Sequence, residues 1–266
     1  MTSFTIHRGS APLLLSIPHA GTEIPAAYQV NLRSLWLARK DTDWWLPELY
    51  DFALGLGATL IVNQISRTVI DVNRDPSGIS LYPGQFTTGL CPVETFDGEP
   101  LYCGGAGPGA DEIARRRYVF FEPYHATLWS EVARLRASHR SIVLYDCHSI
   151  RSVVPRLFEG TLPHFNIGTN DGNACDPAVA AKTVAICAAS SDFTYVANGR
   201  FKGGFITRHY GDPARGVNAI QMELACRGYM AEPETLTPDT SPTRYDERYA
   251  APLRVVLRSV LESFLS

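Results

Sequence analysis

Short runs of apolar residues alternate along the chain with longer segments whose apolar residues recur at helical spacing. The apolar runs predict buried strands, at residues 12–17, 58–63, 142–146, 164–168 and 217–224. The helical spacing predicts amphipathic helices, at residues 44–56, 110–138, 176–190 and 244–265. Strands that alternate with helices indicate an α/β fold with a mostly parallel or mixed central sheet flanked by helices on both faces. Because no internal repeat or linker interrupts the pattern, residues 1–266 are expected to form one domain.

Three segments depart from this regular alternation. Pro123 lies inside the predicted helix 110–138 and is expected to kink or divide it. Residues 66–75 alternate like a strand that would carry several polar side chains on one face. Residues 75–108 are rich in Gly and Pro without a sustained period, and long loops of this kind are usually functional or covered by their own packing.

Composition and charge exclude several classes of partner. The chain is 45% hydrophobic and 19% charged, as in an ordinary soluble globular protein. A net charge of −3 and a pI near 6.2 argue against a nucleic-acid partner, because no basic stripe is present to neutralise phosphates. No apolar run has the length of a membrane span, and the first seven residues lack the apolar core of a signal peptide. The six cysteines form no CxxC pair, which fits reduced thiols in the cytoplasm.

Two of the apolar runs lead directly to histidines. His19 follows the run at 13–17, and His148 follows the run at 142–144 after an intervening Asp146. In open α/β sheets, ligands bind at the carboxyl ends of the strands. A catalytic zinc takes three protein ligands and leaves one position open, and both histidines are candidates. The alternative is that each is a hydrogen-bonded structural histidine.

The third ligand should be a carboxylate, and three are available. Asp43 stands at the start of a predicted helix, where an aspartate can also serve only as a helix cap. Glu23 lies four residues after His19 on the same loop. Asp146 would face the same side of its strand as His148, so it could instead orient that histidine through a hydrogen bond.

Two further side chains suggest chemistry at strand positions. Glu223 lies late in an apolar strand, where an unpaired carboxylate is costly. It is therefore either the partner of a buried arginine or a general base for a water molecule activated by the metal. Cys147 beside His148 raises the alternative of a cysteine hydrolase. Adjacent side chains of a strand point to opposite faces, so this pair is not expected to meet.

Arginines are frequent near these positions. On the segment 66–75, Arg67 would share a face with Asp71 and Asn73, and Arg74 offers a planar fork for a substrate carboxylate. Other arginines follow the strands that end in the candidate residues, at Arg151, Arg156 and Arg208. Several arginines around one pocket would suit a small dianionic substrate, although each one alone could form a surface ion pair.

A set of motifs in fixed order resembles the N-formylglutamate amidohydrolases. The motifs span about residues 12 to 230 and are SIPHAGT (16–22), DTDW (41–44), SR (66–67), DVNR (71–74), LYPGQ (81–85), DCHSI (146–150), NGRFKGG (198–204) and QMEL (221–224). The resemblance implies an α/β domain related to the zinc carboxypeptidases. It also implies hydrolysis of N-formyl-L-glutamate to L-glutamate and formate, the last step of a histidine-degradation route, with one divalent metal ion, expected to be zinc.

The resemblance also suggests roles for individual residues. His19 resembles the first metal ligand, His148 the later one, Glu223 the base, and Asn73 with Arg74 the grip on a substrate carboxylate. Carboxypeptidases place the metal-binding carboxylate three residues after the first histidine, where this chain has Thr22. The deformylase-like pattern offers Asp43 instead, with Glu23 as the second choice.

These observations combine into one hypothesis. The metal is held by His19, Asp43 and His148, and Glu223 accepts a proton from water and later protonates the leaving amine. Arg67 helps to stabilise the oxyanion, and the substrate carboxylates are held by Asn73, Arg74, Arg156 and Arg208. Two alternatives remain: the same site could hydrolyse another N-acyl amino acid or a short peptide, or the protein could bind acidic amino-acid derivatives without catalysis.

Overall fold

One mixed sheet forms the centre of the molecule. The computed structural model describes residues 3–80 and 82–265, so Leu81 of the LYPGQ motif and the first two residues lie outside it. In the described residues the sheet has seven strands in the order β1-β3-β2-β4-β7-β5-β6. The strands are β1 Phe4–His7, β2 Leu13–Ile17, β3 Thr59–Asn63, β4 Ile142–Ile150, β5 Phe165–Gly168, β6 Tyr195–Ala197 and β7 Val217–Ala225.

The middle of the sheet is parallel and its two sides are not. Strands β3, β2, β4 and β7 run parallel to one another. Strand β1 pairs antiparallel with β3, and β5 pairs antiparallel with β7. The predicted mostly parallel or mixed sheet is therefore confirmed. Strands β1 and β6 were missed because both are short and partly exposed at the edges, so neither forms an apolar run.

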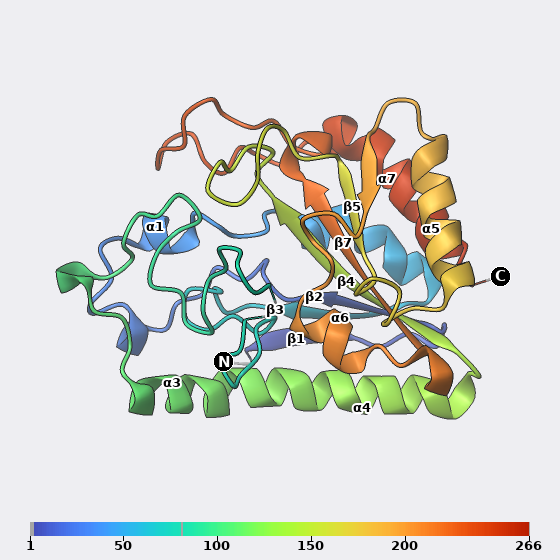
Figure 1. Cartoon of the computed structure of the whole chain (residues 1–266), viewed down its shortest axis with the longest axis horizontal. Helices are drawn as coiled ribbons and strands as arrows, with labels where there is room; N and C mark the ends of the chain where they lie inside the picture. Colours follow the sequence, from blue (N-terminus) through green and yellow to red (C-terminus); the bar gives the residue numbers. More distant parts are fainter. Residues whose placement is uncertain (1–2, 81, 266) are drawn as a thin grey trace.

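Helices cover both faces of the sheet, as predicted (Figure 1). One face packs against α2, α5 and α7, and the other packs against α4 and α6. The α-helices are α1 Leu35–Arg39, α2 Leu46–Leu49, α3 Ala110–Arg116, α4 Glu122–Ser138, α5 Pro177–Ala189, α6 Phe205–Tyr210 and α7 Glu247–Glu262. Among the described residues, no helix combines the length and apolar character needed to span a bilayer.

Two predicted elements take a different form. The helix expected at 44–56 is split, because α2 ends at Leu49 and a 3-10 helix, Asp51–Leu56, follows it. The segment 66–75 is a series of turns rather than a strand, with Val69 N–H donating to the Ser66 carbonyl and Arg74 N–H to that of Asp71. Its alternation of polar and apolar residues reflects burial on two sides of a turn, not pairing in the sheet.

The helix around Pro123 and the strand before His148 also differ from expectation. Pro123 lies in the first turn of α4, directly after a π-helical turn. A π-helical turn, Arg117–Phe121, joins α3 to α4, so the proline does not divide the helix. Strand β4 continues to Ile150, so His148 lies within the strand and not after it.

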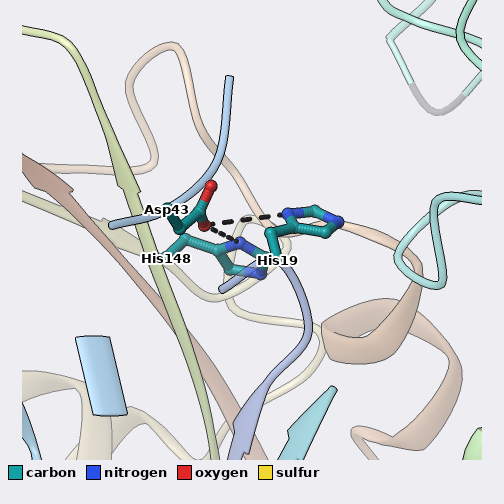
Figure 2. A group of neighbouring side chains, drawn as sticks. All are labelled: His19, Asp43 and His148. Atoms are coloured by element: carbon teal, nitrogen blue, oxygen red, sulfur yellow. Dashed lines mark hydrogen bonds and ion pairs between the residues drawn. The ribbon is translucent and has the colours of Figure 1, made fainter. Parts of the chain in front are cut away.

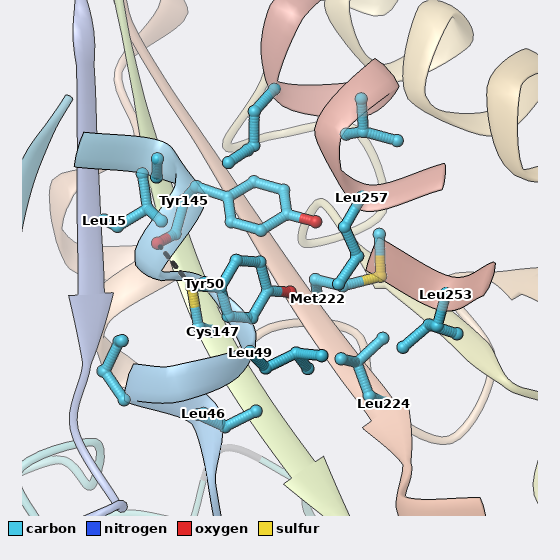
Figure 3. Packing of buried hydrophobic residues seen from close by; sticks show 14 of the residues in the cluster. Leu15, Leu46, Leu49, Tyr50, Tyr145, Cys147, Met222, Leu224, Leu253 and Leu257 are labelled. Carbon is cyan, nitrogen blue, oxygen red and sulfur yellow. Dashed lines mark hydrogen bonds between the residues drawn. The ribbon is translucent and has the colours of Figure 1, made fainter. Parts of the chain in front are cut away.

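The alternation of β4 separates a hydrophobic core from the polar site. Figure 3 shows Tyr145 and Cys147 of β4 packed with Tyr50 and with Met222 of β7, on the face covered by α2 and α7. The intervening residues of β4 point to the face covered by α4 and α6. The packed core therefore holds β4 and β7 in register while their alternate side chains are free to form a site.

Candidate active site

The candidate site lies at the carboxyl ends of β2, β4 and β7. His19 follows β2 by two residues, and its carbonyl accepts a hydrogen bond of 3.1 Å from the N–H of Asp43. This bond holds the segment before α2 against the end of β2. His148 of β4 stands opposite Glu223 of β7 in the parallel register. The parallel strands thus bring together residues separated by up to 204 positions of sequence.

Two histidines converge on one carboxylate. The Oδ2 atom of Asp43 lies 3.1 Å from Nδ1 of His148 and 3.7 Å from Nδ1 of His19 (Figure 2). One potential ligand atom from each residue lies within 4.8 Å of the others, and all three side chains are almost fully buried. The structure therefore brings together the three residues predicted to bind metal.

Each histidine turns its other nitrogen to a buried carboxylate. His19 Nε2 lies 2.7 Å from Asp71 Oδ1, and His148 Nε2 lies 3.0 Å from Asp146 Oδ2. Metal-binding histidines usually have such a partner, which fixes the tautomer and the ring orientation. Asp146 was predicted in this position, but Asp71 was not, because a turn brings it to His19 across 52 residues of sequence.

The cluster fits a divalent cation. Nδ1 of His19 and Oδ1 of Asp43 are buried but have no hydrogen-bond partner. A buried polar atom without a partner costs free energy, so such atoms suggest a missing ligand. Two imidazole nitrogens and one carboxylate are also the number and type of donors found in catalytic zinc sites. Glu23, the second choice, is exposed and forms no part of the cluster.

Charges around the cluster stabilise its carboxylates. Burial by itself raises the pKa of Asp43, but the hydrogen bond with His148 and the electrostatic attraction of the nearby His19 outweigh burial and hold this pKa below its usual range. Arg67 lies 3.6 Å from Asp43, and it donates a hydrogen bond of 2.7 Å to Asp71. Its Nε is buried and has no partner, so one donor of this side chain remains available.

Glu223 lies in a different electrostatic environment. Its side chain is 7% exposed and accepts a hydrogen bond of 3.0 Å from Gln221 Nε2. Burial raises the pKa of Glu223 to about 7, with His148 opposing this shift and Asp43 adding to it. Within residues 3–80 and 82–265, no basic side chain forms an ion pair with Glu223, which contradicts the alternative of a buried arginine partner.

A pocket, called here the central pocket, opens beside the cluster. Its lining includes His19, His148 and Glu223, together with Arg67, Asn73, Arg74 and Arg200. Asn73 Nδ2 donates to Asp146 Oδ2 at 3.1 Å, and its Oδ1 accepts from the N–H of Ile206 at 2.7 Å. Both ends of the Asn73 amide are thus bonded to the protein, which ties the start of α6 to the histidine site.

The structure brings only some of the predicted arginines to this pocket. Arg156 and Arg208 are not among the described residues that line it. Arg156 pairs with Glu94 at 2.6 Å, and Arg208 donates to the Gly203 carbonyl at 2.8 Å. Arg200 lines the pocket but was not predicted as a site residue, although the NGRFKGG motif that contains it was noted. A basic residue inside the Gly-rich loop between β6 and α6 is the signal that could have indicated it.

Cys147 does not contribute to this site. It lies on the opposite face of β4 from His148, fully buried near Tyr50 and Tyr145 (Figure 3). Burial raises the pKa of the Cys147 thiol well above its usual value. A thiol that stays protonated and faces away from the histidine is a poor nucleophile, so the structure does not support a cysteine hydrolase.

Fold and site together define a hydrolytic enzyme of the α/β class, with a His–Asp–His cluster and a separate buried glutamate at the carboxyl ends of the strands. A family model described as N-formylglutamate amidohydrolase matches residues 11–230. The chain belongs to this N-formylglutamate amidohydrolase family, as the motifs predicted.

Two curated relatives are similar over almost their whole length. N-formylglutamate deformylase from Pseudomonas putida is 46% identical over 264 residues, which cover 98% of this chain and 95% of that protein. N-formylglutamate deformylase from Pseudomonas aeruginosa is 48% identical over 259 residues, which cover 97% of this chain and 94% of that protein.

The fold also matches two solved structures. One is N-formylglutamate amidohydrolase from Ralstonia eutropha JMP134, with a TM-score of 0.80, 22% identity and coverage of 99% and 97%. The other is a gene product of Agrobacterium tumefaciens, with a TM-score of 0.72, 19% identity and coverage of 99% and 96%.

Proposed function

We propose that this chain hydrolyses the formamide bond of N-formyl-L-glutamate and releases L-glutamate and formate. The observation that carries the proposal is one pocket that opens beside a metal-fitting cluster and is lined by a glutamate with a pKa of about 7 and by arginines. The near-full-length similarity to two proteins named N-formylglutamate deformylase supports the choice of substrate. The same proposal includes a role as the last step of histidine degradation in the cytoplasm.

The cluster would hold one divalent metal ion, with zinc as the expected metal. His19 and His148 would bind through Nδ1, since their Nε2 atoms face Asp71 and Asp146. Asp43 would supply the third ligand. An ion held by these residues lowers the pKa of water and polarises a carbonyl oxygen.

Glu223 performs the proton transfers in this proposal. As a carboxylate it accepts a proton from the attacking water while the water oxygen bonds to the formyl carbon. It then gives this proton to the amide nitrogen as the carbon–nitrogen bond breaks, so the products are formate and the free amine of glutamate. A pKa of about 7 lets the same group act first as base and then as acid near neutral pH. Arg67, with its unpaired Nε–H, is placed to stabilise the oxyanion that forms between the two steps.

Arg74 and Arg200 are our candidates for binding the two carboxylates of the substrate. Both line the central pocket. Arg200 donates to the backbone carbonyls of Leu157 and Phe86, each at 2.8 Å. Burial lowers the pKa of Arg200, and the positive charge of Arg74 adds to this effect. An anion between the two arginines would relieve their repulsion, which favours a small dianionic substrate. Arg156 and Arg208 would reach the substrate only if their present contacts were broken.

Formate release from N-formyl-L-glutamate tests the proposal. Chelated protein should be inactive, and one equivalent of zinc should restore turnover, because the cluster has ligands for one ion. N-acetyl-L-glutamate and N-formyl-L-aspartate serve as comparison substrates and should be turned over more slowly. Full activity after complete metal removal would contradict the mechanism, and faster turnover of either comparison substrate would contradict the assigned specificity.

A further inference from the structure

Two further pockets border the central pocket, one at each of its two ends. At one end, a second pocket shares the lining residues Arg74, Tyr82, Thr87 and Thr88. At the other end, the residues shared with a larger neighbouring pocket are Phe96, Ser149 and Ile150. We call this larger neighbour the side pocket, and its apolar lining includes Trp44, Val153, Met230 and Leu236. Because the two neighbours share no residue, the Arg74 end and the Phe96 end are distinct.

Phe96 is a fixed part of the wall between the central and side pockets. Its side chain is 7% exposed, and its N–H donates to Asp41 Oδ2 at 2.7 Å. The next residue, Asp97, forms ion pairs with Lys40 at 2.6 Å and with Arg151 at 2.9 Å. The short hairpin 94–100 that carries Phe96 is therefore attached to two other segments of the chain. These bonds fix the backbone at Phe96, and its buried ring packs in a cluster with Ile150 and Val154, so Phe96 acts as a wall.

The reacting carbonyl lies toward this wall if the proposed function is correct. Phe96 packs on Arg67, with 4.9 Å between the guanidinium carbon and the ring centre. Arg67 in turn lies 3.6 Å from Asp43 of the metal-fitting cluster. With the glutamate carboxylates at the arginine end, the substituent on the carbonyl carbon extends toward Phe96. In a formyl group that substituent is only a hydrogen atom.

We propose that Phe96 determines acyl-group specificity by closing the side pocket to the substrate. This inference rests on the proposed function and adds the residue that restricts the acyl group to formyl. An acetyl or longer acyl chain would place carbon atoms where the Phe96 ring stands. The side pocket beyond the ring is lined partly by charged residues and partly by apolar side chains, and its apolar part, which includes Trp44, Met230 and Leu236, has the chemistry to accept an alkyl chain. Removing the ring should therefore join the two pockets and admit longer N-acyl glutamates.

The test compares a series of substrates on wild-type protein and on two variants, Phe96→Ala and Phe96→Leu. The substrates are N-formyl-, N-acetyl-, N-propionyl- and N-butyryl-L-glutamate, and the readout is release of glutamate, which all four share. One methylene in an apolar pocket changes kcat/KM by about 10–200-fold. We expect Phe96→Ala to raise kcat/KM for N-butyryl- relative to N-formyl-L-glutamate by a factor in this range. Phe96→Leu should give a smaller increase.

Val153→Ala provides the matched control. Val153 lines the side pocket but not the central pocket, and it is 51% exposed. It should leave the ratios between substrates as in wild type, because the Phe96 wall stays closed. Thermal unfolding of each variant checks that the fold is retained.

If both Phe96 variants fail to fold, inhibition of the wild-type protein replaces them as the test. The Ki of N-butyryl-L-glutamate against deformylation should then be at least about tenfold higher than the KM for N-formyl-L-glutamate.

The outcomes separate this inference from the proposed function. A wild-type protein that releases no glutamate from any of the four substrates overturns both. Deformylation by wild type combined with unchanged substrate ratios in folded Phe96 variants overturns only the role of Phe96. The role of Phe96 is also overturned if wild type turns over N-formyl- and N-butyryl-L-glutamate equally fast. A Ki of N-butyryl-L-glutamate equal to the KM for N-formyl-L-glutamate has the same consequence.

Discussion

At the scale of single residues, burial of Glu223 costs stability but also gives its carboxylate a pKa that suits catalysis. A carboxylate held away from water without a cationic partner is costly, and this cost appears as a raised pKa. The hydrogen bond from Gln221 compensates only part of the cost. Such strongly shifted groups in a cleft are frequent at catalytic sites. Glu223 is therefore the residue at which a structural and a chemical role can be separated most clearly.

The first prediction concerns Glu223→Gln, which removes the proton acceptor but keeps size and polarity. Turnover of N-formyl-L-glutamate should fall by roughly 10²–10⁴-fold, the contribution of a positioned base. Metal content and KM should change little, because the cluster and the arginines are untouched. Metal analysis and steady-state kinetics on one preparation check both statements. A variant that stays fast per folded molecule would end the assignment of Glu223 as the base.

Stability as a function of pH provides the structural control for the same variant. The folded protein holds the Glu223 proton up to a pKa of about 7, whereas the unfolded chain releases it near 4.5. The group therefore favours folding below about pH 4.5, and this contribution is lost as the pH rises to about 7. Metal-free Glu223→Gln should be more stable than metal-free wild type at pH 8, by roughly 1–3 kcal/mol. The difference should shrink toward pH 5, and lower stability of the variant at pH 8 would contradict the raised pKa.

At the scale of elements, the start of α6 and the turns at 66–75 support each other. Asn73 joins them, because its Oδ1 accepts from Ile206 N–H and its carbonyl accepts from Phe205 N–H. The same side chain reaches Asp146, which orients His148. Gly204 leaves the space that this arrangement needs, since a Cβ there would lie 2.4 Å from Asn73 Nδ2. Two short elements thus control the geometry of a residue on β4.

The second prediction is that Gly204→Ala damages the site while the sheet stays folded. The added methyl group must displace the Asn73 amide, which disturbs the hydrogen bonds around His148. We expect a loss of turnover of at least tenfold, with a destabilisation of about 1–3 kcal/mol as in other overpacked sites. Kinetics and denaturant unfolding measure the two effects. Gly55→Ala is the control, because a Cβ at Gly55 meets open space, and unchanged activity in Gly204→Ala would refute the coupling.

At the scale of the whole molecule, the cluster links distant parts of the chain. His19 follows β2, Asp43 precedes α2, and His148 belongs to β4, so the three residues meet only in the folded protein. A ligand that binds the folded state alone stabilises it by mass action. Their meeting also leaves two buried atoms without partners, which makes the metal-free fold less stable than it could be.

The third prediction follows from this linkage. Zinc at about 100 times its Kd should add about 2.7 kcal/mol of stability, which corresponds to a rise in Tm of about 5–10 °C. Calorimetry on chelated and zinc-loaded protein measures the shift. His19→Ala should lose it, whereas His7→Ala should keep it, because His7 is exposed on β1 away from the cluster. An identical Tm with and without zinc in wild type would argue against the site.

The sequence by itself determined the buried central strands of the sheet and the general position of the site. Strands β2, β3, β4 and β7 are buried on both faces, and such strands require the continuous apolar runs that reveal them. Because parallel strands end at one edge, residues at their carboxyl ends could be expected to meet. This reasoning placed His19 and His148 together, and the spaced motifs indicated the family and a role for Glu223 as the base.

Only the tertiary structure decided what depends on turns and on contacts between loops. Periodicity could not distinguish the turns at 66–75 from a strand, so the contact of Asp71 with His19 stayed hidden. The choice of Asp43 over Glu23 depends on which loop folds back on β2, through one backbone hydrogen bond. Arg200 lines the pocket while Arg156 and Arg208 do not, because the loops that carry Arg156 and Arg200 and the short helix α6 that carries Arg208 are arranged by long-range contacts. A local pattern of apolar residues indicates only whether its own segment is buried. A contact between two loops depends on the sequences and positions of both segments.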